Sequence, residues 1–248
     1  MATLTVFTPL YNRINTLKRT YESLKRQTSK DFVWLIIDDG STDNPYEIIK
    51  EWIKINNGFE IKYVYKENGG MHTAHNTAYE NIDTELNVCV DSDDYMPDNA
   101  VQLIIDCWNK NKNKGYAGII ALDFADSTKK VIGKELPTDK ESTTLMGYYN
   151  NGGFGDKKLI YSTDIIKQTP PYPVFDNEKY VALAYKYHLI DEKYELKILN
   201  ECVCIVDYQM DGSSTNMYRQ YVRNPKGFAF WRKEQMKHSI NTLSLIHI

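Results

Sequence analysis

The sequence predicts an α/β fold: a mostly parallel central sheet flanked by helices, with a smaller mixed C-terminal part. Its 248 residues, 42% hydrophobic and 25% charged, are enough to bury a sizeable core. Before residue 111, four short runs that favour strands each precede a stretch with helical periodicity. Strands that alternate with helices in this way favour a parallel sheet joined by right-handed crossovers.

The first half of the chain divides into strands and helices in order. Short apolar runs predict strands at 4–8, 32–37, 61–65, 86–90 and 116–124. Between them, apolar residues recur at helical spacing, as in Ile14, Leu17, Tyr21 and Leu24. These periods predict helices that begin near residues 14, 48, 71 and 97.

The second half carries weaker patterns. The segment 133–155 has few periodic cues and reads as a mobile loop or lid. A helix is predicted to open at Val174 and to continue to His188. Shorter elements are expected at 130–132, 159–161 and 164–167, followed by an extended run at 197–208 and a turn at 211–214. We divide the chain into 1–125, 126–215 and a basic, aromatic, helical tail at 216–248.

Composition and charge limit the classes of partner. A net charge of −3 argues against nucleic acid. The four cysteines contain no Cys-x-x-Cys pair, which fits a reducing cytoplasm, and neither a secretory signal nor a membrane span is predicted. The tail at 216–248 is expected either to contact the inner face of a membrane as a peripheral element or to pack its aromatic rings on the domain.

An apolar run that ends in three carboxylates is the feature on which the functional prediction depends. Asp91, Asp93 and Asp94 follow the strand at 86–90, and crowded acids repel one another unless a cation joins them. Residues two apart on an extended chain point the same way, so Asp91 and Asp93 can share one ion. Carboxylates suit Mg²⁺ or Mn²⁺ and leave positions open for diphosphate oxygens. The alternative is an acidic turn that caps the helix begun by Pro97.

The chemically unusual residues all follow strands. The loops after the first four predicted strands are 8–12, 38–43, 68–71 and 91–94. Ligands of parallel α/β sheets bind beyond the carboxyl ends of the strands. We therefore expect these loops to lie along one edge of the sheet, which favours a functional role for the Asp-x-Asp pair.

Four motifs, in this order, resemble those of the family 2 glycosyltransferases, inverting enzymes with the A-type, Rossmann-like nucleotide-sugar fold. They are Thr8-Pro9-Leu10-Tyr11-Asn12, Ile36-Ile37-Asp38-Asp39-Gly40-Ser41-Thr42-Asp43, Asn68-Gly69-Gly70 and Asp91-Ser92-Asp93-Asp94. The resemblance, to members that decorate bacterial surface polysaccharides, implies a nucleotide-sugar-binding half at 1–125 and an acceptor-side half at 126–215. It implies transfer of a sugar from a UDP-type donor to a hydroxyl of a glycan or lipid-linked saccharide.

The resemblance also implies a set of nucleotide-binding residues. Tyr11 would lie against the base, and Asp39 would accept a hydrogen bond from the imide of uracil. Where the family often has an arginine this chain has His75, which is either a phosphate contact or a structural histidine. The full implied set is Thr8, Pro9, Tyr11, Asp39, Asn68, Gly70, His75, Asp91 and Ser92.

A divalent metal and a catalytic base complete what the resemblance implies. Asp93, with Asp91, would ligate the Mn²⁺ or Mg²⁺ that bridges the donor phosphates. Inversion needs a carboxylate to take the proton of the acceptor hydroxyl. The family places that acid at the start of a helix, where this chain offers Glu178, with Asp176 as second choice. The alternative is that both acids only cap the helix.

Two other functions stay open from the sequence. One is a nucleotide-sugar-binding module without turnover. The other is an Asp-x-Asp phosphohydrolase, which is disfavoured because such motifs normally carry Thr or Val where this chain has Tyr95. The donor sugar and the acceptor are not predicted.

Overall fold

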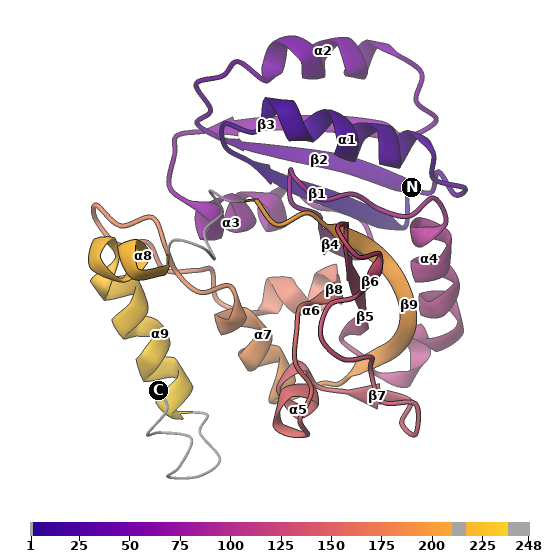
Figure 1. Ribbon diagram of the computed structural model, residues 1–248, viewed down its shortest axis with the longest axis vertical. Coiled ribbons are helices and arrows are strands. Elements are labelled where there is room, and N and C mark those ends of the chain that lie inside the picture. Colours follow the sequence, from indigo (N-terminus) through magenta and orange to yellow (C-terminus); the bar gives the residue numbers. More distant parts are fainter. Residues whose placement is uncertain (1, 210–216, 238–248) are drawn as a thin grey trace.

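The structure, a computed structural model, describes residues 2–209 and 217–237 (Figure 1). Its strands are β1 (Leu4–Leu10), β2 (Phe32–Asp39), β3 (Glu60–Lys66), β4 (Leu86–Cys89), β5 (Gly118–Ala125), β6 (Lys130–Val131), β7 (Ser142–Thr143), β8 (Lys157–Ser162) and β9 (Leu196–Val206). They form one sheet in the order β3-β2-β1-β4-β8-β5-β9-β7, with β6 paired to β5. The pairs among β1 to β4 and the pair β5–β9 are parallel, whereas β8 is antiparallel to both neighbours. The predicted fold class is confirmed.

Helices cover both faces of this sheet. In the first half they are α1 (Ile14–Lys25), α2 (Tyr46–Lys54), α3 (Met71–Asn81) and α4 (Ala100–Asn111), the last followed by the 3-10 turn η1 (Lys112–Lys114). The second half adds α5 (Leu145–Asn150), α6 (Thr163–Gln168) and α7 (Ala184–Asp191). Buried side chains of α1, α2 and α4 fill the core on one face, and those of α3, α5, α6 and α7 fill it on the other. No helix in the described ranges is long and apolar enough to cross a membrane.

Strand β1 lies at the centre of the first half, and every residue in it is buried. Its side chains alternate between the two cores, so that Val6 faces the core of α1 and Phe7 faces that of α3. In the core on the α1 side, the first core, three aromatic rings stack: Tyr21 lies on Trp52 with ring centroids 4.1 Å apart and on Trp34 at 5.9 Å. Burial on this scale holds the ends of β1, β2 and β4 in fixed positions.

Two sequence predictions for the second half are wrong in detail. The helix expected from Val174 begins only at Ala184, because Asn177 has a φ of 64°, outside the right-handed helical region. The backbone N–H of Lys179 donates to Asn224 Oδ1 at 2.7 Å. The segment 133–155 is more than a loop, since it contains β7 and α5. The hydroxyl of Thr144 caps α5 by accepting from the backbone N–H of Gly147 at 2.8 Å. The turn predicted at 211–214 lies outside the described residues.

The tail is described from 217 to 237, where it forms α8 (Met217–Arg223) and α9 (Pro225–Lys237). Figure 1 shows both helices beside the second half of the chain. Phe228 stacks on Tyr180 with centroids 4.5 Å apart, and Phe230 meets Tyr185 at 4.9 Å. The aromatic rings of α9 therefore pack on the domain, which is one of the two arrangements expected for the tail. Tyr218 of α8 is 82% exposed.

The hydrogen bond between the side chains of Thr8 and Trp34 in the core on the α1 side can be tested by mutation. The hydroxyl of Thr8 accepts from the indole N–H of Trp34 at 3.0 Å, and both side chains are fully buried. We expect Thr8→Val to lower the free energy of unfolding by about 1 to 3 kcal/mol, because the buried indole donor loses its partner. Chemical unfolding measures this change. In a Trp34→Phe background, which lacks the donor, the same substitution should cost less, and equal costs in both backgrounds would contradict the assignment.

Candidate active site

The loops that the sequence places at one edge of the sheet do surround a single cavity, of about 1160 Å³. Parallel pairing brings them together, since the ends of β1, β2, β3 and β4 lie side by side. The implied nucleotide and metal residues that line it are Pro9, Tyr11, Asp39, Asn68, Gly70, Asp91, Ser92 and Asp93. The second half and the tail complete the wall with residues that include Asp123, Asp156, Lys158, Asn177, Asp207 and Arg223.

Asp39, the last residue of β2, is 4% exposed and fully engaged. Its carboxylate accepts from the ammonium of Lys66, the side-chain amide of Asn68 at 3.0 Å, and the backbone N–H groups of Gly69 at 2.9 Å and Gly70 at 2.8 Å. A carboxylate has about four lone-pair sites, so these donors use its whole capacity. Asp39 therefore fixes the Asn-Gly-Gly turn to β2, and a base imide would have to replace one of these donors.

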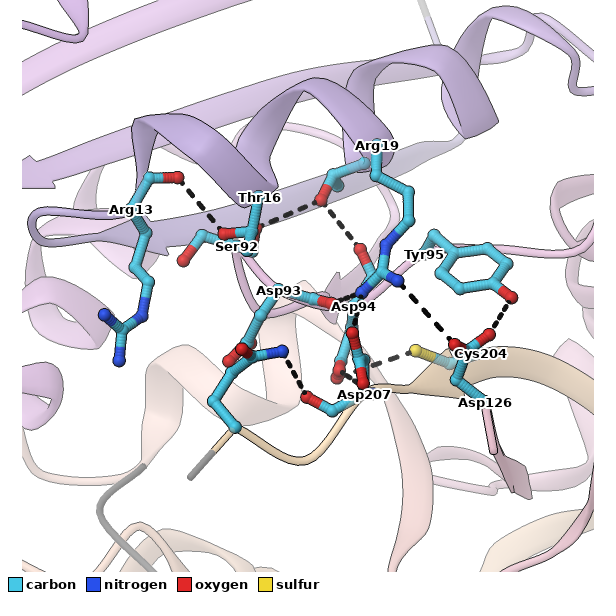
Figure 2. A network of polar contacts seen from close by, with 12 residues as sticks. Arg13, Thr16, Arg19, Ser92, Asp93, Asp94, Tyr95, Asp126, Cys204 and Asp207 are labelled. Carbon is cyan, nitrogen blue, oxygen red and sulfur yellow. Dashed lines mark hydrogen bonds and ion pairs between the residues drawn. The ribbon is translucent and has the colours of Figure 1, made fainter. Parts of the chain in front are cut away.

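Arg19 of α1 holds the Asp-x-Asp loop in place (Figure 2). Its guanidinium donates to the backbone carbonyl of Asp93 and to Asp207 Oδ2 at 2.7 Å. The backbone N–H of Asp207 in turn donates to Asp94 Oδ1 at 3.1 Å, which joins the loop to the end of β9. Burial raises the pKa of Asp94 to about 7, and burial together with Asp91 raises that of Asp93. Asp91, Asp93, Asp94 and Asp207 thus form a group of interacting carboxylates in the cavity wall.

One cation in the cavity wall was not predicted from the sequence. Lys158, on β8, lies with its ammonium 3.7 Å from Asp123 Oδ1. Burial alone would lower the pKa of Lys158, but Asp123 and the more distant Asp94 and Asp91 outweigh it, and the pKa is raised. Burial also raises the pKa of Asp123 to about 6. Lys158 therefore supplies a permanent positive charge among the carboxylates.

Two implied nucleotide residues lie outside the cavity wall. Thr8 points into the core, as described above. His75 is 1% exposed, meets Phe7 edge to face with centroids 5.0 Å apart, and places Nδ1 3.3 Å from the hydroxyl of Tyr79. Burial lowers its pKa to about 3. His75 therefore has the structural role that the sequence left open, and His72, one turn earlier on α3, lines the cavity instead.

Neither implied catalytic base lines the cavity. Glu178 is 8% exposed, and its two carboxylate oxygens accept from the backbone N–H groups of Lys226 at 3.0 Å and Gly227 at 2.8 Å. It therefore caps the start of α9, a helix other than the one that the sequence predicted at this position. Asp176 is exposed and makes no hydrogen bond or ion pair with the described chain, and its neighbour Asn177 lines the cavity.

The turn that carries Glu178 is held between the starts of two helices. A Cβ atom on Gly70, which precedes α3, would lie 2.0 Å from the carbonyl oxygen of Lys179. A Cβ atom on Gly227 of α9 would lie 1.9 Å from that of Tyr180. Only glycine allows these two close approaches, which place the turn beside the cavity.

The carboxylates of Asp91 and Asp93 fit a hard divalent cation. Both residues line the cavity, and oxygen donors are the ligands that Mg²⁺ and Mn²⁺ prefer. Among the described residues, no three His, Cys, Asp or Glu side chains converge into a complete metal cage. Mg²⁺ commonly uses one or two carboxylates and takes its other ligands from water and substrate phosphates. Asp91 and Asp93 are thus a suitable partial set for a metal that binds with its substrate.

Comparison with known proteins identifies the family. The family description Glycosyl transferase family 2 matches residues 5–169, so the chain belongs to this family. It is 35% identical over 101 residues to the glycosyltransferase GlyA of Streptococcus pneumoniae, covering 41% of this chain and 14% of that protein. It is 33% identical over 178 residues to a Rickettsia bellii glycosyltransferase, covering 68% and 25%. The chain spans a quarter or less of the length of these relatives.

Solved structures show the same fold. The Staphylococcus aureus protein TarS, in complex with UDP-GlcNAc, superposes with a TM-score of 0.70 at 17% identity, covering 99% of this chain and 69% of TarS. The mannosyltransferase PcManGT of Pyrobaculum calidifontis, in complex with GDP-Man and Mn²⁺, gives 0.60 at 17% identity, covering 93% and 64%. The family and the fold that the sequence motifs implied are therefore confirmed.

The contribution of Glu178 to the stability of α9 can be tested with Asp176 as the control. We expect Glu178→Gln to lower the free energy of unfolding by about 2 kcal/mol, because a neutral amide cannot accept from both N–H groups at the start of α9. The control is Asp176→Asn, which removes a nearby acid without a partner in the described chain and should leave stability unchanged. Urea titration of both variants gives the comparison, and equal midpoints would show that Glu178 does not support α9.

Proposed function

We propose that this chain is an inverting glycosyltransferase that moves a sugar from a UDP-type donor to a hydroxyl of a glycan or lipid-linked saccharide. The observation that carries the proposal is that Tyr11, the turn at 68–70 and the pair Asp91 and Asp93 line one cavity although they lie far apart in the sequence. Its volume, about 1160 Å³, suits a ligand the size of a nucleotide sugar. Similar folds in complex with UDP, UDP-GlcNAc and GDP-Man support a nucleotide-sugar donor.

Two groups of residues in the cavity wall suit the two parts of such a donor. Tyr11, 49% exposed, offers a ring against which a base can pack. Asp91 and Asp93 would hold Mn²⁺ or Mg²⁺, which when bound would neutralise charge on the departing diphosphate. Arg223 of α8 lines the same cavity, and its side chain makes no hydrogen bond or ion pair with any described residue. Its guanidinium is therefore available to phosphate oxygens.

For the catalytic base we propose Asp176, with Glu178 as a positioning residue. The base must take the proton of the acceptor hydroxyl as that oxygen bonds to the sugar and the diphosphate leaves. A carboxylate that already accepts two backbone N–H groups, as Glu178 does, is poorly placed to accept a proton. The exposed carboxylate of Asp176 has no such partners in the described chain. It lies outside the cavity wall but next to Asn177, which lines the cavity, so an acceptor that enters from this side can meet it.

A peripheral membrane contact fits a lipid-linked acceptor. Residues 217–237 contain six Lys or Arg and one Glu, and Tyr218 and Val222 are 82% and 65% exposed on α8. We propose that this surface contacts an anionic membrane. We expect the protein to sediment with anionic vesicles but not with neutral ones. A protein that does not sediment with anionic vesicles, or that sediments equally with both kinds, would contradict the proposal.

The metal role of Asp93 has a direct test. We expect Asp93→Ala to abolish Mn²⁺-dependent binding of UDP, because Asp91 alone cannot complete the shared site. Titration calorimetry with and without Mn²⁺ measures the affinity. Asp98→Ala is the control, because Asp98 lies in the same loop but pairs with Arg26 and is not part of the cavity wall. Unchanged UDP affinity in the Asp93 variant would refute this assignment.

The role of Asp176 is separable from donor binding. We expect Asp176→Asn to bind UDP like the wild type while transfer falls by about 10²-fold or more, the usual contribution of a general base. Release of UDP from a UDP-sugar, with acceptor saccharides supplied, measures transfer. Equal turnover would exclude Asp176 as the base. A wild-type chain that binds the donor and never releases UDP would instead be a nucleotide-sugar-binding module.

A further inference from the structure

His72 is a polar residue in the cavity wall with no hydrogen-bond partner. It is the second residue of α3, is 1% exposed, and neither of its ring nitrogens bonds to any group in the described chain. His75, one turn later, has both nitrogens near partners, the hydroxyl of Tyr79 and the thiol of Cys89. Buried polar atoms are nearly always paired, so the unpaired ring of His72 calls for a partner that enters the cavity.

The charge state of His72 limits what that partner can be. Burial, opposed by Asp39 and reinforced by Lys66, lowers its pKa to about 4, so the ring is neutral near pH 7. A neutral imidazole offers one N–H donor and one acceptor nitrogen. This pair suits a neutral group that itself carries a donor and an acceptor, such as the polar edge of a nucleobase. It suits a diphosphate less well, since that group only accepts.

The position of His72 favours the same end of the donor. The charged groups that act on it are Asp39 and Lys66, beside the turn at 68–70. Those that act on Asp93 are Asp91, Arg13 and Asp207, a set that shares no member with the charged groups around His72. Asp39 cannot itself accept a base N–H without giving up one of its four donors, so recognition of a base beside the turn at 68–70 needs a second polar group.

We propose that His72 is a specificity-determining residue that hydrogen-bonds the nucleobase of the donor, an inference that rests on the proposed function. The protein covers both ring nitrogens in the structure, so the ring must turn toward the cavity on binding. Side-chain rotations of this kind accompany many binding events. Met71, the adjacent residue, also lines the cavity and is 44% exposed.

The experiment compares His72→Phe with the wild type by titration calorimetry in Mn²⁺. Two ligands are titrated. One is the nucleoside diphosphate, UDP or GDP, that the wild type binds more tightly, and the other is inorganic pyrophosphate, which lacks the base. We expect His72→Phe to weaken nucleotide binding about tenfold or more, to leave pyrophosphate affinity unchanged, and to keep or raise the melting temperature, because an unpaired polar ring is replaced by an apolar one. His72→Gln, which keeps a donor and an acceptor, should recover part of the affinity.

The outcomes separate this inference from the proposed function. The role of His72 would be overturned if His72→Phe bound the nucleotide as tightly as the wild type, or if it lost as much affinity for pyrophosphate as for the nucleotide. Either result would leave the transferase proposal intact. A wild-type protein that binds neither nucleotide would overturn the proposed function itself and His72 with it. If His72→Phe does not fold, His72→Leu makes the same comparison.

Discussion

Carboxylates gathered at one edge of a sheet repel one another, and this cost is the constraint on which the rest of the site depends. The protein offsets it with three cations taken from different elements. Lys66 of β3 holds Asp39, Arg19 of α1 joins the end of β9 to the Asp-x-Asp loop, and Lys158 of β8 lies against Asp123. Each cation binds an acid far away in the sequence. The charge pairs therefore also fix the relative positions of the loops, and Asp91 and Asp93 remain to face the cavity.

The sequence predicts the first half of this arrangement well because local pattern and topology agree there. Each strand and helix has its own period, and parallel connections place the loops on one edge. Asp39 and Asp93 therefore line the same cavity. The second half is different, because β8 runs antiparallel between β4 and β5 and no local pattern reveals that direction. Lys158, at the start of β8, was missed for this reason. Asp207 could have been found, because it directly follows a long extended run.

The sequence also does not reveal which groups each side chain of the site contacts. Glu178 looks like a catalytic acid until its two partners, 48 and 49 residues later, are known. The reverse holds for His72, which resembles any buried helical histidine until its lack of partners in the described chain is seen. The family match ends at residue 169, yet Asn177, Asp207 and Arg223 line the cavity. Features that distinguish this chain from its relatives can therefore lie beyond the matched region.

Two glycines give the site an unusual mechanical property. Because Gly70 and Gly227 have no side chains, the backbones of three segments touch directly: the start of α3, the turn at 178–180 and the start of α9. No flexible side chain lies between them to absorb a displacement. The starts of α3 and α9, which lie far apart in the sequence, are therefore linked by backbone contacts alone. A larger residue at either glycine would force one of these helices away from the turn at 178–180.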